Sequence, residues 1–456
     1  MGAIPMGDRK ISVGLCGFGI VGQGVYDHLP RKRKLLGEQL GADIRVARVA
    51  VRDKSKKRDV EIDPSLITED SLSVATDLEI EVVCELMGGT GLALEIVTRA
   101  LVAGKIVVTA NKALLCDHGK ELLATAQEHG GHWVFEASVG GGIPVIKAIR
   151  EGLIINDFSR IDGILNGTCN YILTRMANEG LSYQESLGEA KLGGYAEADE
   201  SWEVDGSDAA HKAVVLAYLA YGKWTDLEEV RLDGITRVNQ EDIRFAEDNG
   251  YAVKLIAFVE RERQSKALYV SVLPVLVPKS SSLGSVDGVF NAISIHGDVV
   301  GETVYIGRGA GRHATSSAVI SDIVDAVKLL IFGGPEGRFP FLDPAPKNGS
   351  ELEIARPEEV HSRYYVRLRV DNRPGVMAEI ASILASREVS LASVTQKEVG
   401  EDAERVSLII TTHMTTEKAI KETVNDLGNL DSVQGSPMTM PIRNFGEKSE
   451  DAWLES

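Results

Sequence analysis

Short apolar runs alternate with helical patterns along the first 150 residues of this 456-residue chain. The apolar runs have the length and composition of buried strands and stand at Ile11–Cys16, Ile44–Val51, Val82–Met87, Ile106–Thr109 and Trp133–Glu136. The clearest helical patterns between them are Leu92–Ala103 and Ala113–Glu128. Buried strands that alternate with helices form a parallel sheet covered by helices on both faces. We therefore predict a doubly wound α/β domain, of the Rossmann type, over residues 1–150.

A glycine-rich turn, Gly17-Phe18-Gly19-Ile20-Val21-Gly22, follows the first predicted strand and opens a helix. Gly17 permits a tight turn, Gly19 lets a pyrophosphate approach the backbone, and Gly22 lets the helix pack closely on the strand. The helix N-terminus adds unpaired N–H groups and the positive end of a dipole. We predict a dinucleotide site at these six residues; a merely tight strand-to-helix turn is the alternative.

The loop after the second predicted strand bears on the choice of dinucleotide. An acidic residue there binds the ribose 2′-hydroxyl of NAD, whereas Arg or Lys accepts the 2′-phosphate of NADP. Asp53 favours NAD, but five of the seven residues 52–58 are basic, in a chain with a formal charge of −18. We expect NADP, bound by Arg52 and Lys54, and leave NAD open. A solvated charged loop is the alternative for the lysines that follow.

Composition excludes several other classes of protein. With 67 acidic and 49 basic residues, the chain is a poor binder of nucleic acids and acidic membranes. Its longest apolar run, Ala213–Tyr221, is far shorter than the roughly 20 residues of a membrane-spanning helix. The four cysteines show neither a CxxC pair nor zinc-ligand spacing, which is typical of the reducing cytoplasm. We expect a cytoplasmic protein.

The rest of the chain predicts two further domains. Residues 151–342 contain longer strands with polar alternate positions, which indicates an α+β domain with a mixed sheet. Residues 343–362 predict a linker, because Phe339–Glu358 holds four prolines and no clear periodicity. A βαββαβ order over residues 363–442 predicts a ferredoxin-like module, which we expect to be removable as a unit. Residues 443–456 form a short acidic tail.

Three segments favour chemistry over simple packing. Lys112 follows the carboxyl end of a predicted parallel strand, the edge at which open α/β sheets bind ligands. Glu136 precedes a glycine-rich loop whose exposed carbonyls could hold a hard cation. Ser207 is a predicted N-cap, so Asp208 and Lys212 lie one turn apart on a helix that its apolar sequence marks as buried. A surface ion pair is the alternative for these two.

Together these segments resemble homoserine dehydrogenase. The matching motifs cover most of residues 10–320 in family order: GFGIVG, ELMGG, TANK, EASVGGGIP, ILNGTCNYIL, GYAEAD and DGSDAAHK. The resemblance implies an enzyme that interconverts L-homoserine and L-aspartate 4-semialdehyde with NADP or NAD, in threonine and methionine biosynthesis. It also implies a homodimer or homotetramer.

The resemblance assigns a role to each group of residues. Lys212 would be the proton donor and acceptor at the substrate oxygen, and Lys112 would assist it beside the nicotinamide. Glu197 and Asp208 would bind the substrate ammonium, with Tyr195 in the same pocket. Hydride transfer leaves alkoxide character on the substrate, which a nearby ammonium can protonate or stabilise.

The same resemblance implies two further sites. Glu136 and three backbone oxygens would hold a monovalent cation such as sodium in a structural role; the oxygens belong to Val139, Gly141 and Ile143. The segment Gly307–Ile323 resembles the family's closing glycine motif, so we expect the chain to return to the cofactor domain at about residues 307–330. Gly311 would then border the cofactor.

The chain departs from the family pattern at Ile20, Gly91 and His313, all beside the expected cofactor. These departures weaken the prediction of a dinucleotide site, but none of them removes a proposed catalytic residue. His211 and Cys169 lie inside matching motifs, and we interpret both as local packing or hydrogen-bonding residues.

The C-terminal module resembles an ACT domain through Val370–Val376 and Ser393–Gln396. The resemblance implies threonine as an effector; a dimerisation module without a ligand is the alternative. For the whole chain, the alternatives are another amino-acid or semialdehyde dehydrogenase and a catalytically silent amino-acid sensor. The absence of a catalytic cysteine motif disfavours thiol chemistry, and the retained lysines disfavour the sensor.

Overall fold

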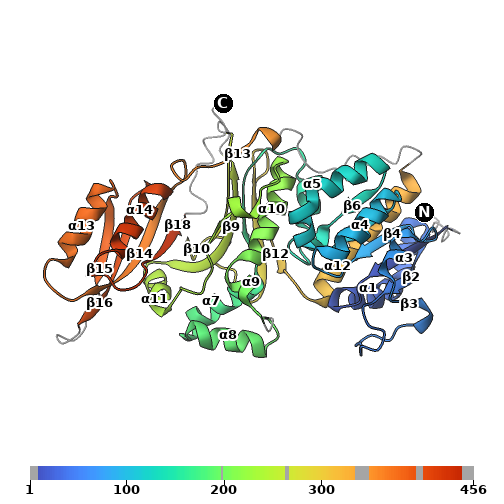
Figure 1. Ribbon diagram of the computed structural model, residues 1–456, viewed down its shortest axis with the longest axis horizontal. Helices are drawn as coiled ribbons and strands as arrows, with labels where there is room; N and C mark the ends of the chain where they lie inside the picture. The colour runs from blue at the N-terminus through green and yellow to red at the C-terminus, as the bar shows by residue number, and fades with distance from the viewer. Residues whose placement is uncertain (1–8, 197–198, 262–265, 334–348, 397–403, 444–456) are drawn as a thin grey trace.

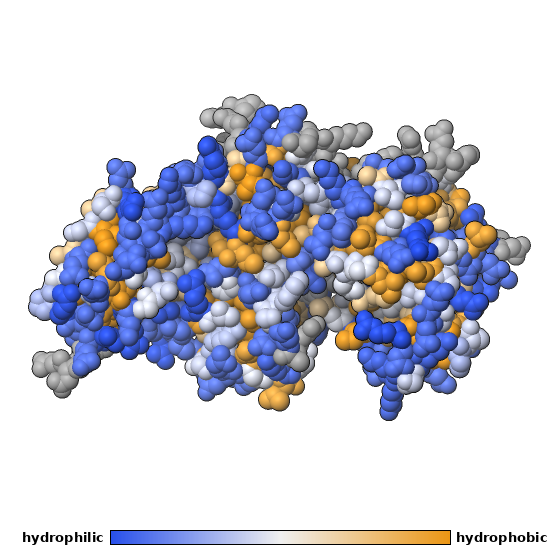
Figure 2. Space-filling model, in the orientation of Figure 1, coloured by the Kyte–Doolittle hydropathy of each residue, from blue (hydrophilic) through white to orange (hydrophobic). Residues whose placement is uncertain are grey.

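The computed structural model describes residues 9–196, 199–261, 266–333, 349–396 and 404–443. The chain is arranged in three parts along its longest axis, with the N-terminal part at one end and the C-terminal module at the other (Figure 1). In the space-filling view hydrophilic residues cover most of the visible face, as the composition leads one to expect (Figure 2). Among the described helices, none combines the length and the apolar composition that crossing a bilayer requires.

Six parallel strands form the first sheet in the order β3-β2-β1-β4-β5-β6, which confirms the predicted doubly wound fold. The strands are β1 (Arg9–Cys16), β2 (Ala42–Ala50), β3 (Ile67–Thr68), β4 (Val82–Glu85), β5 (Ile106–Thr109) and β6 (His132–Val134). The helices are α1 (Ile20–Arg31), α2 (Arg33–Leu40), α3 (Ser71–Thr76), α4 (Gly91–Val102) and α5 (Lys112–His129). The strand order reverses between β1 and β4, and ligands of such sheets bind at the carboxyl ends of strands at this point.

A second sheet runs through the middle part and the C-terminal module in the order β12-β11-β7-β9-β10-β18-β14-β16-β15. Its main strands are β7 (Phe158–Ile164), β9 (Tyr251–Arg261), β10 (Ala267–Pro278), β11 (Phe290–Gly297), β12 (Gly301–Arg308), β14 (His361–Asp371), β15 (Leu391–Gln396), β16 (Arg405–Thr412) and β18 (Met438–Ile442). Short strands β8 (Arg231–Leu232) and β13 (Glu353–Ile354) pair with β10, and β17 (Thr415–Thr416) pairs with β14. Neighbouring main strands are antiparallel except β10 and β18.

The remaining helices cover this sheet or connect the parts. They are α6 (Val145–Lys147), α7 (Gly167–Glu179), α8 (Tyr183–Leu192), α9 (Ser201–Val204), α10 (Ser207–Tyr221), α11 (Gln240–Asp248), α12 (Arg312–Phe332), α13 (Val376–Ser386) and α14 (Glu417–Gly428). Helix α12 leaves the middle part and packs against α1, so the chain does return to the first part. The short segments η2 (Glu136–Ser138) and η3 (Ala148–Gly152) flank α6.

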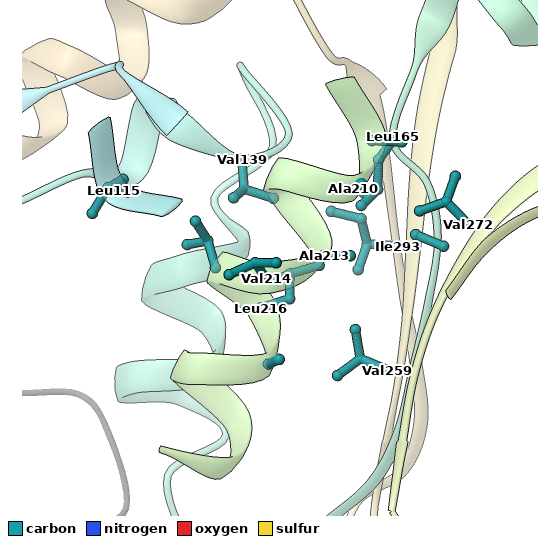
Figure 3. Packing of buried hydrophobic residues seen from close by; sticks show 14 of the residues in the cluster. Leu115, Val139, Leu165, Ala210, Ala213, Val214, Leu216, Val259, Val272 and Ile293 are labelled. Carbon is teal, nitrogen blue, oxygen red and sulfur yellow. The ribbon is translucent and has the colours of Figure 1, made fainter. Parts of the chain in front are cut away.

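Helix α10 lies in the core between the first part and the second sheet. Its residues 209–221 are all buried. Figure 3 shows α10 side chains between Leu115 and Val139 on one side and Val259 and Ile293 on the other. Because the first two turns of this buried helix carry the predicted catalytic pair, packing of the whole core fixes the position of that pair.

The C-terminal module is not structurally separate from the rest. The described part of the predicted linker contains β13, and its residues Leu352, Ala355 and Val360 are buried. Residues of the module, including Tyr365 and Met440, belong to the same core cluster as α10. Residues 349–362 of the predicted linker therefore pack on the rest of the molecule, while residues 343–348 and most of the predicted tail lie outside the described residues.

Candidate active site

Asp208 and Lys212 form a buried ion pair at the start of α10. The helix begins at Ser207 with Gly206 as its N-cap, so the predicted cap was wrong by one residue, but the one-turn spacing holds. Nζ of Lys212 lies 2.7 Å from Oδ2 of Asp208 and also donates to the carbonyl oxygen of Leu165 at 2.7 Å. Lys212 is only 9% exposed, so its ammonium depends on these two acceptors.

Lys112 joins this pair from the first part of the chain. It is the first residue of α5, whose N-cap Asn111 accepts a hydrogen bond from the N–H of Leu114. Nζ of Lys112 lies 3.2 Å from Oδ1 of Asp208, while Lys212 occupies Oδ2. One carboxylate therefore bridges two ammonium groups at the carboxyl edge of the first sheet.

Burial and charge act in opposite directions on these groups. Burial favours a raised pKa for Asp208, but the charges of Lys212 and Lys112 outweigh it and hold the pKa below its usual range. Burial lowers the pKa of Lys212, and Lys112 acts in the same direction against the opposing charge of Asp208. Lys212 therefore releases its proton more readily than an exposed lysine, which suits a proton-transfer group.

Asn166 is a site residue that the sequence reasoning missed. As N-cap of α7 its Oδ1 accepts from the N–H of Cys169, and its Nδ2 donates to Oδ2 of Asp208 at 2.9 Å. The preceding residue, Leu165, supplies the carbonyl that accepts from Lys212. An asparagine directly before a helix is a recognisable cap, but that signal does not reveal that its amide also reaches Asp208.

Glu85, to which the sequence reasoning assigned no role, is a fully buried carboxylate at the end of β4. Oε1 accepts from the backbone N–H of Gly88 at 3.3 Å, and Oε2 accepts from the hydroxyl of Thr109 at 2.7 Å. Nδ2 of Asn111 donates to the carbonyl of Gly89 at 2.7 Å. These bonds fix the loop after β4 against the start of α5.

The glycine turn has the form that a pyrophosphate requires. Gly17 has φ of +109°, and a Cβ there would lie 2.5 Å from the carbonyl oxygen of Leu86. A Cβ on Gly22 would lie 2.2 Å from the carbonyl oxygen of Gly17, whereas one on Gly19 would meet nothing within 4 Å. Ile20, the first residue of α1, is 63% exposed. There is therefore no room for a side chain at Gly17 or Gly22, whereas the space beside Gly19, where a phosphate is expected, is open.

The basic loop after β2 lies beside this turn. Arg58 folds the loop by donating to the carbonyl of Asp53 at 2.6 Å, and its guanidinium lies 6.0 Å from the ring centroid of Phe18. Arg52 and Lys54 are exposed. Arg58 therefore organises the loop, and the two predicted phosphate ligands face solvent near the turn.

Glu136 caps α6 from a buried position. Its two carboxylate oxygens accept from the N–H groups of Ile146 at 3.0 Å and Lys147 at 2.8 Å, and its own N–H donates to Asp322 at 2.8 Å. Burial raises the pKa of Glu136 to about 7. The predicted carbonyl ligands lie on the loop between η2 and α6, at Val139, Gly141 and Ile143. Each carboxylate oxygen keeps acceptor capacity, so a buried cation is chemically compatible with this group.

The remaining predicted site residues are Tyr195, Glu197 and Gly311. Tyr195 is 45% exposed, its carbonyl accepts from the hydroxyl of Thr168 at 2.5 Å, and its ring lies 4.9 Å from that of Tyr171. Glu197 lies outside the described residues. Gly311, with φ of +106°, is the N-cap of α12.

The chain matches three family descriptions in the order of its parts. Residues 17–136 match the NAD binding domain of homoserine dehydrogenase, residues 144–324 match homoserine dehydrogenase, and residues 364–431 match the ACT domain. The homoserine dehydrogenase of Pseudomonas aeruginosa is 40% identical over 96% of this chain and 100% of its own length.

Solved structures give the same result. A homoserine dehydrogenase from Thiobacillus denitrificans superposes with a TM-score of 0.87 at 38% identity, covering 96% of this chain and 99% of the other. A hyperthermophilic archaeal homoserine dehydrogenase in complex with NADPH has a TM-score of 0.58 at 28% identity, covering 70% of this chain and 98% of the other. With a nicotinamide-binding domain, a paired-lysine site and this level of identity, the chain belongs to the homoserine dehydrogenase family of oxidoreductases.

Proposed function

We propose that this protein interconverts L-homoserine and L-aspartate 4-semialdehyde with NADP as the preferred cofactor and NAD as the second. The observation that carries the proposal is the bridge of Lys112 and Lys212 across Asp208. This bridge lies at the sheet edge where the glycine turn also opens, so an alcohol bound there has both a proton acceptor and a cofactor site within reach.

Lys212 moves the proton at the hydroxyl oxygen of homoserine. Its buried amine accepts that proton during oxidation and returns it during reduction, while the ammonium of Lys112 stabilises negative charge on the same oxygen. When bound, the nicotinamide supplies the acceptor or donor of the hydride. Oxidation of an alcohol to an aldehyde removes one proton and one hydride, and this scheme provides a separate acceptor for each of them.

Asp208 has two tasks in this scheme. It holds both lysines in place, and together with Glu197 it binds the ammonium of the substrate, because two carboxylates suit one cation. Tyr195 borders the same pocket. Asn166 keeps the carboxylate oriented through its 2.9 Å hydrogen bond.

The dinucleotide fits the residues that are present. The open position at Gly19 and the N-terminus of α1 suit the pyrophosphate. Arg52 and Lys54 are exposed and could take the 2′-phosphate, whereas Arg58 is engaged by the backbone carbonyls of Asp53 and Lys56. The bound NADPH of the archaeal relative supports the same preference.

A monovalent cation such as sodium would lie against Glu136 and the carbonyls of residues 139, 141 and 143, in a structural role. Support comes from the burial of Glu136 beside the equally buried Asp322, since two neighbouring carboxyl groups favour an added positive charge. A homodimer or homotetramer in the cytoplasm completes the proposal. The described cysteines are all unpaired, which suits a reducing compartment.

Threonine is the proposed effector at the C-terminal module. A cavity of about 350 Å³ lies beside the loop after β14. It is lined by Asp371, Asn372, Arg373 and the backbone of Gly375, together with β15 and β16. The opposite charges of Asp371 and Arg373 in a small cavity suit the ammonium and carboxylate of an amino acid.

The test is an absorbance assay of cofactor reduction with L-homoserine and either NADP or NAD. We expect turnover with both and a higher kcat/KM with NADP. Turnover of another hydroxy amino acid, with none of homoserine, would overturn the substrate assignment. Adding threonine to the same assay tests the effector, and no change in rate would leave the module an assembly element.

A further inference from the structure

Helices α5 and α10 bring together three side chains that no role in the reaction explains. Cys116 and Asp117 lie on α5, and His211 lies on α10. One ligand atom from each lies within 4.8 Å of the other two. The sequence shows no metal-ligand spacing here because the three residues come from different helices.

His211 is held in the form that a metal ligand requires. Its Nδ1 lies 2.8 Å from the carbonyl oxygen of Ser207, and because a carbonyl only accepts, Nδ1 carries a proton, so that in the neutral ring the lone pair is on Nε2. The ring stacks on Trp202 at 5.4 Å between centroids, and His211 is 4% exposed. Metal-bound histidines typically donate their second ring N–H to such a carbonyl, which fixes tautomer and orientation.

Access from solvent and local charge both suit a cation. Asp117 is exposed and Cys116 is half-buried, so an ion can reach the cluster from outside. A bound cation would balance the negative charge of Asp117 and of a Cys116 thiolate, and the thiol proton would leave to solvent as the metal–sulfur bond forms.

We propose that Cys116, Asp117 and His211 bind one thiophilic divalent cation of the zinc class. Thiolate, imidazole and carboxylate are the donors that zinc takes in proteins, and three protein ligands leave a fourth position for water. This site is distinct from the sodium-type site at Glu136, whose donors are all oxygen.

The proposed metal ligands lie close in sequence to the two lysines of the active site. Cys116 lies one helical turn after Lys112 on α5, and His211 directly precedes Lys212 on α10. A bound ion therefore ties together the two helices that carry the lysines of the active site. Because the cation binds the folded arrangement of the two helices, it raises the unfolding temperature of the protein.

The test uses cobalt(II) as a spectroscopic probe on the full chain after treatment with a chelator. We expect one equivalent to produce a thiolate-to-cobalt band in the near ultraviolet and tetrahedral bands in the visible. Cys116→Ala should remove the thiolate band. Asp117→Asn, an exposed change that leaves the helix intact, should weaken cobalt binding by at least about tenfold, the lower end of what loss of a supporting group costs.

His118→Gln is the matched control, since His118 is the next residue on the same helix and lies outside the cluster. It should bind cobalt like the original chain. A thiolate band that survives Cys116→Ala, equal affinity in Asp117→Asn, or no uptake by the original chain would each overturn the proposal. Zinc should raise the unfolding temperature of the original chain more than that of Asp117→Asn, because the weaker site gives less stabilisation at the same zinc concentration; equal shifts would also overturn the proposal. None of these readouts depends on homoserine turnover.

Discussion

Oδ1 of Asp208 lies 3.2 Å from the ammonium nitrogen of Lys112, so one ion pair joins α10 of the middle part to α5 of the N-terminal part. The same carboxylate holds Lys212 at 2.7 Å through its other oxygen. Asp208 therefore helps to position both lysines, and its charge acts on the pKa of Lys212. That dependence leads to the first prediction.

Asp208→Asn should shift the pH dependence of homoserine oxidation to lower pH. Burial already lowers the pKa of Lys212, and Asp208 is the charge that raises it, so neutralising Asp208 lowers the pKa further. The oxidation rate rises with pH as Lys212 loses its proton, and this rise should therefore begin at lower pH. The KM for homoserine should increase as well. Asp205→Asn, on an exposed carboxylate of the preceding turn, is the control; an unmoved profile in Asp208→Asn would contradict the scheme.

Lys212→Ala should reduce kcat by about 10²–10⁴-fold, the usual contribution of a general acid–base group. Affinity for the cofactor should stay close to that of the original chain, because the hydrogen bonds of the Lys212 ammonium go to Asp208 and to the carbonyl of Leu165, both outside the glycine turn. Steady-state rates and cofactor titration on one preparation give both values. A loss of less than roughly tenfold would show that the proton goes elsewhere.

Gly19→Ala and Gly22→Ala should separate cofactor binding from folding. A Cβ on Gly19 meets no atom within 4 Å, so stability should hold while NADP binding weakens at the pyrophosphate. A Cβ on Gly22 would press on the carbonyl of Gly17 at 2.2 Å, and such overpacking costs about 1–3 kcal/mol of folding free energy. Denaturant unfolding and cofactor titration of both variants check the pair. Equal loss of stability would show that Gly19 is only a packing residue.

Arg52→Ala should weaken NADP binding more than NAD binding. A guanidinium on the 2′-phosphate makes charge-assisted hydrogen bonds that the hydroxyl of NAD cannot replace. Arg58→Ala should instead weaken both cofactors, because Arg58 holds the loop through the carbonyls of Asp53 and Lys56. Michaelis constants for the two cofactors distinguish the variants. Equal losses in Arg52→Ala would assign the preference to Asp53.

Asp242→Asn should weaken inhibition by threonine while threonine still binds. Asp242 on α11 is fully buried and accepts from the hydroxyl of Tyr365 at 2.7 Å and from Arg367 at 2.8 Å, both on β14. Helix α11 packs on α7, whose N-cap Asn166 bonds to Asp208. An effector shifts the enzyme only if it binds two states unequally, and this buried contact connects the two sites.

The measurements are the rate as a function of threonine concentration and threonine binding by calorimetry. Glu247→Gln is the control, because Glu247 lies on the same helix but pairs with Lys279 rather than with the module. Unchanged inhibition in Asp242→Asn would mean that coupling runs through the shared sheet at β10 and β18 instead.

The sequence alone determined the features that depend on local geometry. Strand and helix periodicities predicted the doubly wound sheet, and the spacing of Gly17, Gly19 and Gly22 predicted its turn, because backbone sterics act over a few residues. The relation of Asp208 to Lys212 followed from the helical repeat in the same way. The carboxyl end of a predicted parallel strand then marked Lys112 as a candidate site residue, and a glycine-rich loop marked Glu136.

Only the tertiary structure decided which distant segments meet. The contact of Lys112 with Asp208, the amide of Asn166 on the same carboxylate, the approach of Cys116 to His211 and the contact of Asp242 with β14 all join residues far apart in the chain. No local pattern encodes these contacts, since they arise when helices and strands pack to bury their apolar faces. The same packing joins the C-terminal module to the core.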